Sequence, residues 1–160
     1  MRNKNVNFKS IHEQKMDFDF SYVEIQNLAI EKWGQDIGSK SPSYFPKKGD
    51  SIFVFKGVGR IHPPFCDCIH TLKDNGLFLP NVTGLVFLEI LDSVYNFLKP
   101  DSWILGFDEL HHLRYEKNFG HFVPCLVKGE NGDYQYTWFA RNGNLENDEY
   151  VLSYKKNEDE

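Results

Sequence analysis

The chain has 160 residues, of which 41% are hydrophobic and 26% are charged, and its formal net charge is −5. This length suits one domain with its own hydrophobic core, and the composition excludes a disordered chain. The negative charge and the lack of a basic run argue against non-specific binding to nucleic acid.

Nothing in the sequence predicts secretion or a membrane span. The first residues, MRNKNVNFKSIHEQKM, contain no apolar stretch of the kind found in signal peptides. Cys66 and Cys68 are too close to bridge each other easily, and a third cysteine leaves an odd number. The most apolar segment, LPNVTGLVFLEILDSVYNFLKP, is interrupted by polar and charged residues. We therefore expect a soluble cytoplasmic protein.

The first third of the chain predicts one helix after a polar start. Residues 1–16 are polar and aperiodic, so we expect a loosely ordered lead-in or a short strand. Residues 21–38 predict a helix with an apolar stripe. Ser21 followed by Glu24 matches a capping box, and Gly34 stands where such a helix would end.

The middle of the chain predicts an interior strand and a buried helix. Residues 51–55, SIFVF, are apolar on both faces, as expected of an interior strand. The stretch PPFCDCIH, residues 63–70, is interpreted as a buried turn, and residues 75–80 as a short strand. Residues 83–98 predict a central helix that is apolar around most of its circumference and is closed by Pro100.

The last third predicts strands. Residues 103–107 form a short apolar run, and residues 121–141 are two β-rich runs joined by a turn at Gly132. Pro124 has no amide hydrogen, so its strand is expected at an edge or bulged there. Residues 150–156 are expected to pair next to this hairpin.

Together these elements predict an α+β fold. We expect an antiparallel β meander of about five strands packed against two main helices. The single domain is expected over residues 17–156, after the lead-in at 1–16 and before a disordered acidic tail at 157–160.

A cluster of thiols and imidazoles is the first candidate site. Zinc accepts both ligand types, and the candidate ligands are Cys66, Cys68, His70, His111 and His112. Structural zinc sites, however, usually draw four ligands from two knuckles with wider cysteine spacing. A redox pair would need Cys-x-x-Cys rather than Cys-x-Cys. The preferred interpretation is that these cysteines are small buried hydrophobes, and a zinc site is the alternative.

The stretch DELHHLRYEKNFGH contains further candidates for chemistry. Glu109 and His112 form a single Glu-x-x-His motif, whereas di-iron bundles need two copies and further carboxylates. Asp108 and His112 would be neighbours on a helix, but no third orienting group is evident. Solvated surface histidines are the preferred interpretation.

The favoured function is therefore a non-catalytic protein-binding module. Its acidic, aromatic-rich composition is typical of immunity or antitoxin proteins that neutralise a basic partner, and a negative surface would steer such a partner. No cofactor, nucleic acid or membrane is expected. The expected partner-binding residues are acidic side chains and a ladder of rings: Asp108, Glu109, Glu146, Asp148, Tyr134, Tyr136 and Trp138. The alternatives are a small metal-assisted enzyme built on the cysteine and histidine cluster, and a scaffold subunit that assembles through the hairpin.

Overall fold

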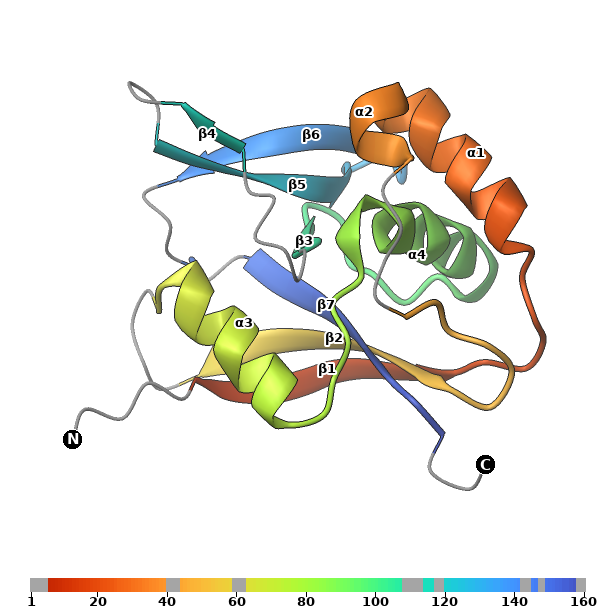
Figure 1. The fold of residues 1–160 in the computed structure, drawn as a ribbon, viewed down its shortest axis with the longest axis horizontal. Helices are drawn as coiled ribbons and strands as arrows, with labels where there is room; N and C mark the ends of the chain where they lie inside the picture. The colour runs from red at the N-terminus through yellow and green to blue at the C-terminus, as the bar shows by residue number, and fades with distance from the viewer. Residues whose placement is uncertain are drawn as a thin grey trace.

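The computed structural model describes residues 6–39, 44–58, 63–107, 114–116, 120–141, 145–146 and 149–157. These residues form a sheet of seven strands with helices packed against it, so the predicted α+β class is confirmed (Figure 1). The strands are β1 (Asn7–Lys15), β2 (Ser51–Val58), β3 (Trp103–Leu105), β4 (Arg114–Glu116), β5 (Gly120–Lys128), β6 (Tyr134–Arg141) and β7 (Glu149–Lys155). The helices are α1 (Tyr22–Trp33), α2 (Gln35–Gly38), α3 (Phe65–Asp74) and α4 (Asn81–Tyr95).

The sheet is mixed, and its strand order differs from that of a simple meander. The order is β1-β2-β7-β3-β5-β4, and β6 pairs with the other side of β5. The predicted β5–β6 hairpin is present, with a positive φ of 87° at Gly132. The last strand does not extend this hairpin as expected. Instead β7 lies between β2, to which it is antiparallel, and β3, to which it is parallel.

The sheet has a hydrophobic core on each face. Neighbouring residues of the inner strands point to opposite sides, so each strand contributes to both cores. Ile104 and Leu126 belong to a first core that includes residues of α1 and α4. Leu105 and Cys125 belong to a second core that includes residues of α3. Figure 1 shows α1, α2 and α4 grouped together, apart from α3.

The first strand and the first helix follow local signals. Of the two expectations for residues 1–16, a strand is the one observed, since Asn7–Lys15 pair along β2. At the start of α1, the hydroxyl of Ser21 accepts a hydrogen bond from the Glu24 amide at 3.3 Å, as the capping pattern predicts. The helix ends at Gly34, whose φ of 89° suits a residue without a side chain.

The segment PPFCDCIH is not a turn, so this prediction is wrong. It begins α3, with Pro64 at the N-cap position. Phe65, Cys68, Ile69 and Leu72 recur at helical spacing and are all buried in the second core. The buried Cys68 completes this apolar stripe, as expected of a small hydrophobe, whereas Cys66 is exposed, so the prediction that both cysteines are buried is wrong for Cys66.

The central helix is confirmed, although α4 starts two residues earlier than expected and ends at Tyr95, before the left-handed Asn96 (φ 49°), rather than at Pro100. The buried Asn81 side chain accepts a hydrogen bond from the Thr83 amide at 2.7 Å, which satisfies one of the free amides in the first turn of the helix. Between α3 and α4 the chain passes beside β7. There Phe78 and Tyr154 form an isolated bridge in place of the expected short strand.

Pro124 lies in an interior strand, neither at an edge nor in a bulge. Its carbonyl accepts a hydrogen bond from the Gly106 amide at 3.0 Å, immediately after β3 ends. In an antiparallel ladder a residue's N–H and C=O point to the same side. The missing amide hydrogen of Pro124 therefore faces the point where β3 stops, and β5 loses no bond to β6.

The end of the described chain is attached to the domain. The Asn157 amide donates a hydrogen bond to the buried Asp50 carboxylate at 2.8 Å. The rest of the predicted tail, residues 158–160, lies outside the described residues.

Candidate functional site

The cysteines and histidine of the candidate metal cluster do not converge. On α3, Cys68 is buried in the second core, whereas Cys66 is exposed. His70 is also exposed, and its Nε2 atom lies 3.1 Å from an Asp74 carboxylate oxygen, one turn along the helix. Among the residues that the structure describes, no group of three or more His, Cys, Asp or Glu side chains is placed to hold a metal. His111 and His112 lie outside the described residues.

Most of the predicted acidic patch also lies outside them. Asp108, Glu109 and Asp148 are not among the described residues. Glu146 is half-buried, and its amide donates to the Glu149 carboxylate at 2.7 Å. An acidic partner-binding surface therefore stays a prediction.

The ring ladder on β6 packs against the helices of the first core. Trp33 of α1 makes edge-to-face contacts with Tyr136 at 5.7 Å and with Trp138 at 5.4 Å between ring centroids. Burial and a hydrogen bond to Asp92 raise the pKa of Tyr134 to about 12, so its hydroxyl stays protonated. All three rings of the ladder are half-buried, and they hold the hairpin against α1 and α4.

A buried polar network lies where α4 meets the hairpin. The Lys128 ammonium donates to the Asp92 carboxylate at 2.8 Å, to the Leu98 carbonyl at 2.8 Å and to the Asn96 side chain at 2.9 Å. Asp92 also accepts hydrogen bonds from the Tyr134 hydroxyl and from the Leu98 amide.

This network has the properties of a structural clamp. Burial alone would raise the pKa of Asp92, but the hydrogen bonds from Lys128 and Tyr134 outweigh it and hold that pKa below its usual value. The side chains of Asp92 and Lys128 are only 0% and 6% exposed. Because every charge is paired and closed to solvent, the network fastens the end of α4 to β5 and β6 and offers no open position for a substrate.

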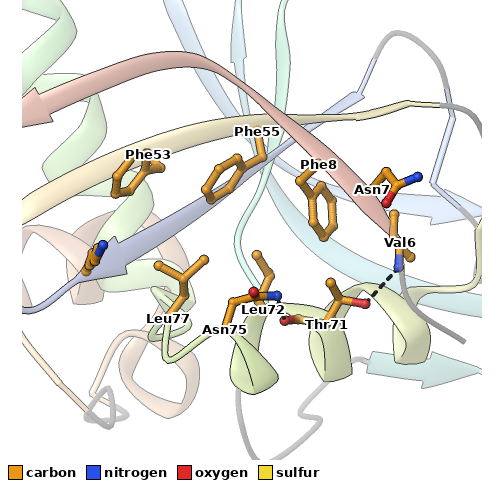
Figure 2. Close-up of a pocket in the computed structure, with 10 residues that line it drawn as sticks. Val6, Asn7, Phe8, Phe53, Phe55, Thr71, Leu72, Asn75 and Leu77 are labelled. Carbon is orange, nitrogen blue, oxygen red and sulfur yellow. Dashed lines mark hydrogen bonds between the residues drawn. The ribbon is translucent and has the colours of Figure 1, made fainter.

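A groove lies beside the second core, between α3 and the β1–β2 pair (Figure 2). Its volume is about 540 Å³, within the usual range of ligand sites. In Figure 2 the rings of Phe8, Phe53 and Phe55 extend from the strands toward Leu72 and Leu77 on the helix side. We refer to it as the phenylalanine groove. It is lined by Val6, Asn7, Phe8, Phe53, Phe55, Thr71, Leu72, Asn75, Leu77 and Lys155.

Strand alternation places these rings on one face. Phe53 and Phe55 stack with their centroids 5.2 Å apart, and Phe8 lies 5.7 Å from Phe55. Phe8 pairs in register with Gly57. Since α3 ends at Asp74, the three rings are only half-covered.

The sequence interpretation did not identify this groove. The apolar residues on both faces of SIFVF predicted complete burial, but only the face carrying Ile52 and Val54 is fully covered. Phe8, a large ring within a polar segment, was a further sequence signal for the groove. Recognising the groove requires knowing that β1 pairs with β2 and that α3 packs beside them.

Comparison with known proteins gives no relative: no family model, curated protein or solved structure matches the chain. Within the described ranges, no helix is both long and apolar enough to cross a bilayer.

Proposed function

We propose that the protein is a non-catalytic binding module that seats a short apolar segment of a partner protein in the phenylalanine groove. The observation that carries this proposal is the contiguous set of three half-exposed rings, Phe8, Phe53 and Phe55, lining a cavity of about 540 Å³. Aromatic side chains in a concave, partly desolvated patch are typical anchors of protein interfaces.

The polar groups at the groove define the partner segment further. The exposed amides of Asn7 and Asn75 stand at its rim, where they can bind the backbone of a seated chain. At one end Lys155 also lines an adjoining hollow with Lys15, Lys156 and a single acidic residue, Glu13, so lysines predominate there. An apolar segment that ends in one or two acidic residues would therefore match both the rings and this basic end.

The lining residues also favour binding over catalysis. None of the ten is His, Cys, Asp or Glu, the usual sources of a nucleophile or a general base. The hydroxyl of Thr71 is already used, because it accepts from the Val6 amide at 2.9 Å and donates to the Asp67 carbonyl at 2.8 Å. The groove thus supplies contact area rather than a reactive group.

The expected basic character applies to the partner protein as a whole, whereas the groove contacts only one short segment of it. A net charge of −5 would accelerate encounter with a basic protein at low salt, while the groove selects the segment that finally docks. The salt dependence of the association rate separates these two steps.

Site-specific photocrosslinking tests the proposal. A benzophenone amino acid placed at the groove rim, at Asn75, is expected to capture one protein in cells of the source organism. The same probe at Val94, which is 69% exposed on α4, is the matched control. A synthetic peptide from the captured contact should bind the purified protein, and Phe55→Ser should weaken that binding roughly 10- to 30-fold, since truncating an aromatic anchor costs about 2 kcal/mol.

Two further results decide the outcome. Val23→Ser, at a side chain 63% exposed on α1, should leave peptide binding unchanged, and circular dichroism should show that both variants are folded. Equal capture from Asn75 and Val94, or equal peptide affinity for folded Phe55→Ser and Val23→Ser, would overturn the groove as the docking site.

A further inference from the structure

A second hollow lies on the opposite face of the β1–β2 pair, beyond the end of α4. Its volume is about 360 Å³, at the lower end of the range for small-molecule sites. Lys56 lines it, whereas the preceding residue, Phe55, lines the phenylalanine groove, so the two cavities lie on opposite sides of β2. We refer to it as the lysine pocket. It is lined by Lys9, Ile11, His12, Lys56, Val58, Phe97, Leu98, Lys99, Ser102 and Tyr150.

Three lysines from separate segments line this pocket. Lys9 and Lys56 are register partners on β1 and β2, which brings their Cβ atoms to within about 5.5 Å of each other. Lys99 comes from the turn after α4, where the Ser102 hydroxyl donates to the Lys99 carbonyl at 2.6 Å. Like charges placed directly opposite on a sheet destabilise it.

No neighbouring carboxylate relieves this repulsion in the part of the chain that the structure describes. None of the three lysines has an acidic partner there, and no carboxylate lines the pocket. The chain as a whole contains 23 acidic and 18 basic residues, so an unpaired group of three cations departs from its overall balance.

His12 and Phe97 also line the lysine pocket. The His12 ring lies flat on that of Phe97, with centroids 3.8 Å apart and an interplanar angle of 2°. The Nε2 atom of this ring is buried and has no hydrogen-bond partner among the described residues. Protein atoms enclose this nitrogen, so the stacked rings of His12 and Phe97 contribute a wall of the pocket, and the three lysines supply its charged contacts.

We propose that the lysine pocket binds a small phosphate-bearing molecule. Lysine ammonium groups act as point charges toward phosphate, and three of them match the multiple charges of a phosphate or diphosphate group. Tyr150 and Phe97 also line the pocket and provide apolar contact for the uncharged part of the ligand. This site is separate from the docking groove and does not depend on it.

Thermal unfolding with defined anions tests the proposal. Pyrophosphate at 100 times its Kd should raise the Tm by roughly 5 to 10 °C, while NaCl at equal ionic strength should not. The triple variant Lys9→Gln, Lys56→Gln, Lys99→Gln should lose this response. A second triple variant changes three exposed lysines outside the pocket, Lys32→Gln, Lys48→Gln and Lys73→Gln, and it should keep the response with the same change in net charge.

The other outcomes are equally distinct. A response that is absent, or lost equally in both triple variants, would overturn the site. A stronger response to citrate than to pyrophosphate would overturn the phosphate assignment.

If the pocket variant aggregates yet keeps the response, the lysines serve only to prevent pairing of the edge strand β1, and the proposal fails. If that variant does not fold, Lys99→Gln alone should weaken pyrophosphate binding roughly fivefold, and unchanged affinity would refute the proposal.

Discussion

Replacing Lys128 by Met tests the buried clamp between α4 and the hairpin. The substitution removes the only cation bound to Asp92 among the described residues, and it leaves the Leu98 carbonyl and the Asn96 side chain without their donor. Removing one partner of a buried ion pair costs about 3–5 kcal/mol. Since domains are stabilised by about 5–15 kcal/mol, we expect Lys128→Met to lose a large part of the stability at pH 7. The corresponding fall in Tm is about 6–20 °C.

The pH dependence of the stability lost by Lys128→Met provides a second test of this reasoning. Asp92 has a lowered pKa in the folded state, so its contribution to stability is present above its unfolded pKa of about 3.9 and is lost as the pH falls through the folded pKa. Without Lys128, burial dominates and that pKa rises, so the deficit of the variant should shrink as the pH falls toward 4. Urea unfolding at pH 7 and pH 4 measures both values. A deficit below about 1 kcal/mol at pH 7, or an equal deficit at both pH values, would refute the reasoning.

Two matched variants complete this experiment. Lys73→Met removes a charge from an exposed position and should change stability by no more than about 0.5 kcal/mol. Combining Lys128→Met with Asp92→Leu removes both buried charges and should recover part of the loss, because no carboxylate is then left unpaired.

Three further predictions follow from local geometry. Ser21→Ala should lower the free energy of unfolding by about 1 kcal/mol because it removes the cap of α1, and a stability that is unchanged in urea would contradict the cap. Gly84→Ala should destabilise by about 1–3 kcal/mol, since the new Cβ would stand 2.3 Å from the Tyr154 hydroxyl; an unaltered Tm would show that α4 and β7 can separate at that point. Titration with a thiol reagent should modify Cys66 alone in the folded protein and all three cysteines in denaturant, and rapid reaction of a second thiol before unfolding would contradict the buried positions of the other two.

Local patterns predicted much of the secondary structure. The capping residues and glycine of α1, the apolar run of α4 and the hairpin turn at Gly132 each act over a few residues, and each is confirmed. The error at α3 was also local in origin. Two prolines were interpreted as a turn, although a proline can also precede the first helical residue, and cysteine was not counted in the apolar stripe.

The positions of the strands and the cavities depend on contacts between distant parts of the chain. No pattern in the last strand specifies that it pairs with β2 and β3 instead of β6. The phenylalanine groove needs Phe8, Phe53 and a helix that begins at Phe65 to meet, and the lysine pocket needs three separate segments. Composition shows that the chain is rich in aromatic residues, but only the paired strands show which rings stay uncovered.

The central position of β7 has a consequence for biosynthesis. Until its residues leave the ribosome, the nascent chain contains two unjoined pieces, the early β1–β2 pair and the later β3–β5–β6 group. Neither piece can bury its exposed strand edge alone, so productive folding waits for the final strand. The long-range pairing of β7 with β2, such as Lys155 with Ser51, makes that step slow. Chains released before this strand is made would therefore expose two unpaired sheet edges that can aggregate, and we expect chaperones and proteases to bind such chains.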